Sequence, residues 1–218
     1  MCGRFSLTTP LEELIRQFMI DEYIEDTAPR YNIAPSQKIL SLISHDGKRK
    51  AGHTTWGLVP SWAKRDKWKP LINARSETLL EKPSFRSLVH KKRMVIFSDG
   101  FYEWKPGDSG KRPVRFQLKS EKPFVFAALW DRSEDGLVTS TILTTEANAV
   151  VSPVHNRMPV ILHDNEQIDM WLDPKHSFGE ASTLLKPYPE TKMKSYGVST
   201  LVNSPKNDVK ECIEPADS

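Results

Sequence analysis

Apolar residues recur at helical spacing at two places in the chain. The first set follows Thr9, the expected N-cap, and Pro10, and it consists of Leu11, Leu14, Ile15 and Phe18. We expect this helix to end near Met19 or Ile20. The second set follows Asp164, is stopped by Pro174, and consists of Ile168, Met170, Trp171 and Leu172. Shorter helical segments are predicted within residues 76–88 and 179–185.

Runs of apolar and β-branched residues predict many short strands. These segments are 38–44, 51–59, 94–97 with its continuation 101–104, 113–118, 124–130, 137–144 and 195–202. Residues 30–35 are interpreted as irregular, and the stretch from about residue 203 as a polar tail. Many short strands with few helices indicate an α+β fold. We therefore expect one compact domain over residues 1–218, with a mostly antiparallel, barrel-like sheet core and a few peripheral helices.

The composition excludes several classes of protein. Hydrophobic residues make up 38% and charged residues 27% of the chain, which is typical of a soluble globular protein. No apolar run reaches the ~18 residues of a membrane span. The N-terminus lacks the apolar segment of a signal peptide, so we expect a cytoplasmic protein without a membrane partner. Cys2 and Cys212 form no C-x-x-C pair, and the histidines show no ligand spacing, so we expect no metal site and no cofactor.

Charge is distributed unevenly along the chain. Residues 48–119 hold 18 lysines and arginines against 6 aspartates and glutamates, whereas the segments on either side are acidic. Four tryptophans fall in or beside this basic stretch, at Trp56, Trp62, Trp68 and Trp104. Cations interleaved with stacking platforms are typical of a surface for single-stranded nucleic acid. The other interpretation is a set of solvated basic loops, with the tryptophans filling the core.

Cys2 directly follows the initiator methionine, and its small side chain permits removal of Met1 by an aminopeptidase. The mature chain then begins with an α-amine of pKa about 7.7–8 beside a thiol of pKa about 8.5. Such an aminothiol condenses with an aldehyde to an imine, which the thiol closes to a thiazolidine. An N-terminal cysteine can instead serve as a hydrolase nucleophile. A small second residue is also common in proteins where it has no such role.

Three further polar clusters interrupt apolar segments. Asn73 and Arg75 share one side of an extended segment, because they are two residues apart. Glu103 lies in an aromatic stretch, where burial would raise its pKa and suit it to proton transfer. His155 and Arg157 lie in a largely apolar region. A capping asparagine, a carboxylate paired with lysine and a core histidine are the structural alternatives.

Six short motifs resemble, in their order, those of the SOS-response-associated peptidase family of abasic-site-processing proteins. The resemblance covers residues 2 to about 160, extends more loosely to residues 202–203, and is to a bacterial member. The motifs are Cys2-Gly3-Arg4-Phe5, Arg30-Tyr31-Asn32-Ile33-Ala34-Pro35, Trp56-Gly57-Leu58-Val59-Pro60-Ser61-Trp62, Asn73-Ala74-Arg75-Ser76-Glu77-Thr78, Asp99-Gly100-Phe101-Tyr102-Glu103-Trp104 and His155-Asn156-Arg157-Met158-Pro159. Any one motif is unspecific, whereas six in order are highly specific.

The resemblance implies a catalytic group at the start of the chain. The target would be an abasic site in single-stranded DNA, and Cys2 would trap its aldehyde as a thiazolidine DNA–protein crosslink that shields the lesion. Glu103 matches the glutamate that assists sugar ring-opening and, in some members, crosslink reversal. His155 matches the histidine that acts as acid and base near the sugar and its phosphate. Asn73 matches the asparagine that hydrogen-bonds the Cys2 end and orients the lesion.

The resemblance also implies a DNA-binding surface. Arg4, Arg75 and Arg157 would hold phosphates, and Pro35 and Trp62 would stack or wedge against bases. Family members often carry a second aromatic residue after the position of Trp62, where this chain has Ala63. The family name further suggests autoproteolytic removal of Met1. We expect a cytoplasmic, nucleoid-associated monomer without a metal or cofactor.

Two other functions remain open from the residues alone. An N-terminal-nucleophile peptidase or amidohydrolase would also need Cys2 but would turn over an amide. A non-covalent single-stranded DNA-binding module would not need Cys2, and its affinity would fall with salt in proportion to the phosphates contacted.

Overall fold

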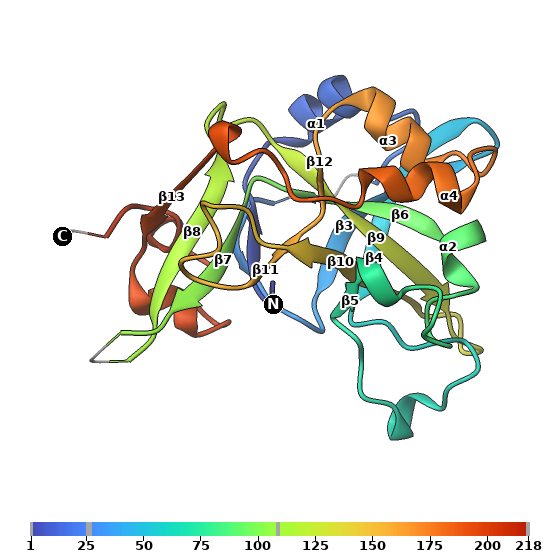
Figure 1. Cartoon of the computed structure of the whole chain (residues 1–218), viewed down its shortest axis with the longest axis horizontal. Helices are drawn as coiled ribbons and strands as arrows, with labels where there is room; N and C mark the ends of the chain where they lie inside the picture. Colours follow the sequence, from blue (N-terminus) through green and yellow to red (C-terminus); the bar gives the residue numbers. More distant parts are fainter. Residues whose placement is uncertain (1, 25–27, 108–109, 217–218) are drawn as a thin grey trace.

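The computed structural model describes residues 2–24, 28–107 and 110–216, and within them the strands form two sheets (Figure 1). The smaller sheet is five-stranded, in the order β13-β8-β7-β1-β2, and all its pairings are antiparallel. Its strands are β1 (Phe5–Leu7), β2 (Arg30–Ile33), β7 (Gly100–Lys105), β8 (Arg112–Leu118) and β13 (Met193–Gly197). The interpretation of residues 30–33 as irregular is wrong. At four residues, β2 is too short to show a strand period, and its pairing with β1 defines it.

The larger sheet has eight strands, in the order β11-β10-β4-β3-β6-β9-β12, with β5 paired to β10. They are β3 (Lys38–His45), β4 (Lys48–Trp56), β5 (Asn73–Arg75), β6 (Arg93–Ser98), β9 (Phe124–Arg132), β10 (Val138–Glu146), β11 (Arg157–Pro159) and β12 (Ile161–Leu162). Because β10 pairs with both β4 and β9, the strands β4, β3, β6, β9 and β10 form a closed circuit. Only the pairings of β10 with β4 and β5 are parallel among the described strands. The expectation of a mostly antiparallel α+β fold is confirmed.

Two strand boundaries differ from the prediction for reasons of backbone geometry. The second predicted strand was expected over 51–59, but β4 ends at Trp56 because Gly57 has a φ of +131°. A Cβ atom at Gly57 would also lie 2.9 Å from Cβ of Pro70. Residues 101–104 were expected to continue the strand at 94–97. They belong instead to β7 in the other sheet, because the chain passes from β6 to β7 at Asp99.

Four α-helices occur in the described residues, and Figure 1 shows α1, α3 and α4 together on one side of the sheets. They are α1 (Leu11–Phe18), α2 (Leu88–Lys91), α3 (Asn165–Leu172) and α4 (Phe178–Ala181). Asp164 caps α3 as predicted, accepting a 2.8 Å hydrogen bond from the Gln167 amide. Thr9 does not cap α1. Pro10 occupies the N-cap position, and the Thr9 side chain donates to Asp99 instead.

Short 3₁₀ turns complete the helical structure. They cover Arg65–Lys67, Ser76–Thr78, Ser182–Leu184, Glu190–Lys192, Thr200–Asn203 and Lys210–Cys212. The helical segment expected within residues 76–88 is therefore a 3₁₀ turn at one end and α2 at the other. The segment expected over 179–185 consists of α4 followed by a 3₁₀ turn.

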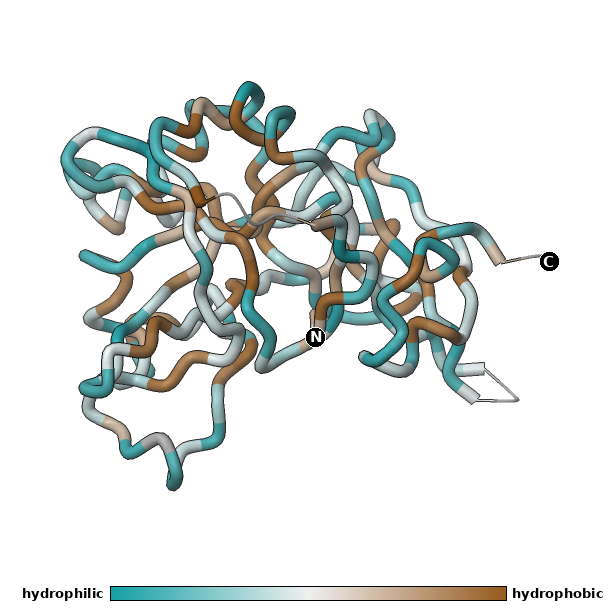
Figure 2. Tube along the Cα trace, turned by 180° about the vertical axis from the view of Figure 1, so that it is seen from behind, coloured by the Kyte–Doolittle hydropathy of each residue, from teal (hydrophilic) through white to brown (hydrophobic). Residues whose placement is uncertain are grey.

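Apolar side chains fill the space between the sheets and helices, and Figure 2 shows the hydrophobic segments concentrated in the interior. Phe5 lies at the centre of an aromatic group, 5.2 Å from Trp56 and 5.6 Å from Phe126 between ring centroids. Helix α3 packs on β6, where the Trp171 indole donates a 2.8 Å hydrogen bond to the Met94 carbonyl. Among the described helices, none combines the length and apolar character needed to cross a membrane.

The stretch after residue 203 was expected to be a polar tail, but the described part of it packs on the smaller sheet. Asp208 accepts hydrogen bonds from the backbone amides of Tyr31 and Asn32, on the outer edge of β2. The Asn32 side chain donates to the carbonyls of three residues, Val202, Ser204 and Asn207. Cys212 is buried beside Tyr102. The polar residues of this segment form hydrogen bonds with the edge strand β2 instead of facing solvent, and the local composition does not indicate this.

Candidate functional site

Cys2 precedes strand β1 and its side chain is fully buried. Its sulfur lies 3.9 Å from the Arg4 carbonyl oxygen. Burial raises the pKa of the Cys2 thiol well above its ordinary value, and the negative charge of Glu103 raises it further. The thiol is therefore neutral in the resting protein and must pass its proton to a base before it reacts. Met1, whose removal we expect, lies outside the described residues.

Glu103 is brought to Cys2 by the pairing of β1 with β7. Phe5 lies opposite Phe101, and the Tyr102 amide donates a 3.0 Å hydrogen bond to the Arg4 carbonyl. This antiparallel register directs the chain before β1 past Glu103. The Glu103 side chain is buried, and burial raises its pKa, whereas its electrostatic interaction with His155 lowers it. Such a carboxyl group can hold and transfer a proton closer to neutral pH than an exposed one.

Asn73 reaches Cys2 from the larger sheet. It begins β5, which lies beside β10. Its Nδ2 atom donates a 2.8 Å hydrogen bond to the Cys2 carbonyl oxygen. Its Oδ1 atom is buried and accepts no hydrogen bond from the described residues. Asn73 thus holds the backbone of Cys2 in place, and its Oδ1 atom is an acceptor without a donor among the described residues.

His155 lies in the loop before β11. The backbone amide of Arg157 donates a 3.0 Å hydrogen bond to Nδ1 of His155, which fixes the orientation of the ring. Electrostatic interaction with His155 lowers the pKa of Glu103, which relates the loop to β7. Residues from the N-terminus, β5, β7 and this loop therefore converge, and Cys2, Asn73, Glu103 and His155 form one cluster. The sequence separates them by up to 153 positions.

Arg75 and Arg157 flank the same strand, since Arg75 pairs with Thr144 and Arg157 with Glu146 on opposite sides of β10. Arg75 is exposed. Arg157 forms a bidentate ion pair with Glu77, with hydrogen bonds of 2.7 and 2.8 Å. This hydrogen bonding lowers the pKa of Glu77. A guanidinium that binds a half-exposed carboxylate with two hydrogen bonds has a geometry that also fits a phosphate.

Arg4 is buried, and its guanidinium already has protein partners. Nη1 donates a 2.8 Å hydrogen bond to Oδ1 of Asn32 and a second bond to the Val202 carbonyl. The group also lies over the Trp104 ring, 5.5 Å from its centroid. Burial lowers the pKa of Arg4. Arg4 thereby joins the N-terminal strand to the C-terminal segment, and its contact with a phosphate stays a prediction.

The two predicted base-contacting residues lie on separate loops. Trp62 is 60% exposed, and its ring meets that of Trp68 edge to face at a centroid distance of 5.0 Å. Asp131 anchors the start of this loop by accepting a 2.7 Å hydrogen bond from the Ser61 amide. Pro35 is half-buried after β2. Although Trp62 is followed in the sequence by Ala63 and not by an aromatic residue, Trp68 supplies a second aromatic ring beside it.

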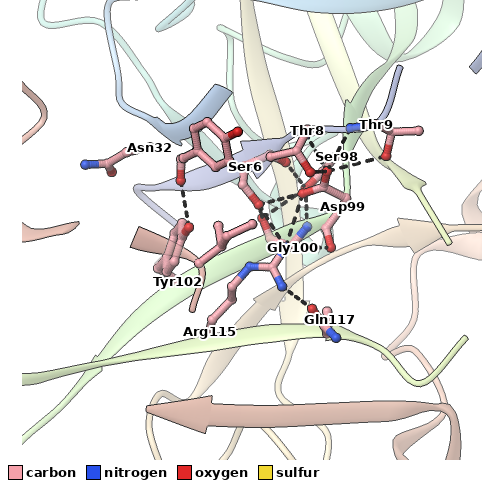
Figure 3. Close-up of polar contacts among 12 residues, drawn as sticks. Ser6, Thr8, Thr9, Asn32, Ser98, Asp99, Gly100, Tyr102, Arg115 and Gln117 are labelled. Atoms are coloured by element: carbon pink, nitrogen blue, oxygen red, sulfur yellow. Dashed lines mark hydrogen bonds and ion pairs between the residues drawn. The ribbon is translucent and has the colours of Figure 1, made fainter. Parts of the chain in front are cut away.

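Sequence reasoning missed a second polar cluster, which lies at the junction of β6 and β7 (Figure 3). Its centre is the buried ion pair between Asp99 and Arg115, 3.2 Å apart. The signals in the sequence are the Asp99-Gly100 pair between two apolar runs and the place of both residues in one of the six motifs. Among residues 2–24, 28–107 and 110–216, no group of three or more His, Cys, Asp or Glu side chains is arranged to hold a metal ion.

Comparison with known proteins places this geometry in a family. A model described as SOS response associated peptidase (SRAP) matches residues 1–205. The chain belongs to this family. The SRAP membership confirms the resemblance carried by the six motifs.

Curated SRAP relatives match the chain over most of its length. Abasic site processing protein YoqW of Bacillus subtilis (strain 168) is 46% identical over 223 residues, covering 98% of this chain and 99% of the relative. Abasic site processing protein HMCES of Gallus gallus is 33% identical, covering 86% of this chain and 66% of the relative. A crystal structure of a protein from Bacteroides thetaiotaomicron is 28% identical, with a TM-score of 0.86 over 99% of this chain and 100% of the other.

Proposed function

We propose that this SRAP chain processes abasic sites in single-stranded DNA by forming a covalent thiazolidine crosslink through Cys2, once Met1 has been removed. The observation that carries the proposal is the cluster at the start of the chain. It combines a buried thiol, an amide bonded to the carbonyl of the same residue, a buried carboxyl group and a histidine. Relatives named abasic site processing proteins support the choice of lesion.

The chemistry follows from the aminothiol of a processed Cys2. The ring-opened abasic sugar exposes an aldehyde at C1′, and the α-amine adds to its carbonyl carbon. Loss of one water gives an imine. The sulfur then adds to the imine carbon while the thiol proton is transferred, through a base, to the imine nitrogen. One water leaves overall and no oxidant is needed, and holding both nucleophiles on adjacent carbons makes the second step intramolecular.

Proton transfer is assigned to the two titratable neighbours of Cys2. Glu103 retains a proton more readily than an exposed glutamate, because burial raises its pKa. It therefore moves protons during sugar ring-opening and during reversal of the crosslink. His155, oriented by the Arg157 amide, acts as acid and base toward the sugar and its phosphate. Asn73 holds the Cys2 carbonyl so that the aminothiol faces the lesion.

DNA is held by cations and aromatic surfaces around this cluster. Arg75 is exposed and contacts phosphate directly, and Arg157 exchanges Glu77 for phosphate. We assign Arg4 to a phosphate contact, which requires its guanidinium to leave its present hydrogen-bond partners. Trp62 and Pro35 stack or wedge against bases, because an exposed indole accepts any base as a stacking partner.

A crosslinking assay tests the proposal. The mature protein is mixed with single-stranded DNA carrying one abasic site and separated on a denaturing gel, and intact mass verifies the loss of Met1. We expect a shifted covalent band that Cys2→Ala abolishes and Cys212→Ala, the matched control, leaves unchanged. No band from the wild-type protein, or an undiminished band from Cys2→Ala, overturns the proposal.

The same samples separate the remaining alternatives. An amidohydrolase would cleave a peptide substrate in a Cys2-dependent way without abasic DNA. A non-covalent binding module would retain all its function in Cys2→Ala. Autoproteolysis predicts that purified wild-type protein still carrying Met1 loses it without an added aminopeptidase, and that Cys2→Ala treated in the same way keeps it.

A further inference from the structure

We propose that Asp99 is a positioning residue for Cys2, because its carboxylate fixes strand β1 in the register that places Cys2 beside Glu103. Strand β1 spans only Phe5–Leu7, and its ladder with β7 joins two residue pairs, Phe5 with Phe101 and Ser6 with Gly100. Its pairing with β2 is irregular between Phe5 and Leu7. So short a ladder specifies register weakly, and side chains must supply the rest.

Asp99 binds the segment that follows Phe5 at several points (Figure 3). Its Oδ1 accepts a 2.6 Å hydrogen bond from the Ser6 hydroxyl. Its Oδ2 accepts bonds from the Thr8 amide and hydroxyl and from the Thr9 amide and hydroxyl. The Asp99 amide also donates to the Ser6 carbonyl at 3.0 Å. One buried side chain thus holds three nearby residues of the N-terminal segment.

Arg115 makes this arrangement possible by neutralising Asp99. Both side chains are almost fully buried, and Nη2 of Arg115 lies 3.2 Å from Oδ1 of Asp99 and 3.1 Å from the Ser6 hydroxyl. Nη1 is held by Gln117 and by the Tyr196 hydroxyl. The guanidinium fits because residue 100 is glycine, since a Cβ atom there would lie 2.6 Å from Cζ of Arg115. The Asp99 carboxylate is held by Arg115 on one side and by the N-terminal segment on the other, so it can serve as a fixed point for β1.

A register error would remove Cys2 from its partners. Cys2 lies three residues before Phe5, and β7 carries Glu103 two residues after Phe101. A slip of one residue moves the strand by about 3.3 Å and turns each side chain to the opposite face. Asp99 therefore acts on the reaction through the placement of Cys2, without contact to the DNA.

The first test uses the two free cysteines of the protein, both of which are buried. Each cysteine is alkylated with iodoacetamide in the folded protein without DNA, and the rates are read by peptide mass mapping. We expect Asp99→Asn to raise the alkylation rate of Cys2 at least tenfold and leave that of Cys212 within twofold. An unchanged Cys2 rate, or an equal rise at both cysteines, overturns the proposal.

A second variant covers the case in which Asp99→Asn fails to fold. Thr8→Val removes one hydroxyl bond to Asp99 and leaves the buried ion pair intact. It should raise the Cys2 rate by a smaller factor, about threefold, again without effect on Cys212. Asp169→Asn is the matched control. It also breaks an ion pair, but one between Asp169 in α3 and Arg49 in β4 that does not involve β1. A Cys2 response in the control equal to that of Thr8→Val counts against the proposal.

The kinetic test rests on the proposed function. In a double-mutant cycle, Asp99→Asn should reduce the crosslinking rate at least tenfold in the wild-type protein. In the Glu103→Gln variant it should reduce the rate less than threefold, because both changes disturb the same interaction between Cys2 and Glu103. Equal factors in the two backgrounds overturn the positioning role. If the wild-type protein forms no crosslink, the proposed function fails, and the alkylation result still decides the role of Asp99.

Discussion

Replacing Asn73 with alanine should separate catalysis from stability. The change removes the 2.8 Å hydrogen bond to the Cys2 carbonyl, and a neutral hydrogen bond of this kind contributes about 0.5–1.5 kcal/mol to folding. It also removes the buried Oδ1 atom that no described residue satisfies, and a buried unsatisfied group costs about 1–3 kcal/mol. The two contributions oppose each other, and at the middle of each range they leave a net change of about 1 kcal/mol in the free energy of unfolding.

The crosslinking rate should respond much more strongly than stability. Without the amide donor, the backbone of Cys2 is no longer fixed against Glu103, and a displacement of about 1 Å in an active site can reduce a rate by about 100-fold. We expect Asn73→Ala to crosslink about 10- to 100-fold more slowly than wild type. Its affinity for DNA containing a tetrahydrofuran analogue, which lacks the aldehyde, should stay within threefold.

Three measurements check this prediction. Time courses on denaturing gels give the crosslinking rate, fluorescence anisotropy gives the affinity, and thermal unfolding gives the stability. A change of about 1 kcal/mol corresponds to about 2–4 °C in a domain of this size. Asn156, an exposed asparagine that directly follows His155, provides the control, because Asn156→Ala should leave all three values unchanged. A wild-type crosslinking rate in Asn73→Ala, or a melting temperature lowered by more than about 8 °C, would refute the reasoning.

Three further predictions concern other parts of the site. Glu77→Gln frees Arg157 from its bidentate partner and should strengthen single-stranded DNA binding about two- to fivefold with a steeper salt dependence by anisotropy titration, whereas weaker binding would contradict it. Trp62→Ala removes an exposed indole and should cost about 1–3 kcal/mol of DNA affinity in the same titration with an unchanged melting temperature. Burial raises the pKa of Glu103, so the stability linked to its protonated form is complete below the ordinary glutamate pKa and is lost as pH rises through the raised value. Glu103→Gln should therefore raise the melting temperature relative to wild type at pH 8, with a difference that shrinks toward pH 4, and a constant difference would contradict the assignment.

Local sequence patterns predicted the long elements of this fold. Helix α3 starts after Asp164, as its capping side chain and apolar spacing indicate, and strands β3, β9 and β10 lie close to their predicted bounds. Strand β2 was missed because four residues show no clear period. Helix α1 begins without a threonine cap because Asp99, distant in the sequence, binds Thr9. Tertiary contacts decided the cases that local preference did not.

The motifs identified the residues of the candidate site but did not predict how these residues come together in space. Chemical reasoning identified Cys2, Glu103 and His155 as residues of interest, and the family resemblance related them to one another. Their proximity depends on the register of β1 with β7, which no local pattern specifies. The roles of Asp99 and Arg115 were hidden for the same reason. Their partners lie in segments as far apart as Ser6 and Tyr196.

The contact between Arg4 and Val202 has a consequence for how the chain is made. The two residues are 198 positions apart, so their bond can form only when almost the entire chain has left the ribosome. At about 5–20 residues per second, synthesis of that stretch takes roughly 10–40 s. During this interval Arg4, which directly precedes the first strand, lacks its C-terminal partner. The N-terminal segment that carries Cys2 is therefore among the last parts of the fold to acquire all its contacts.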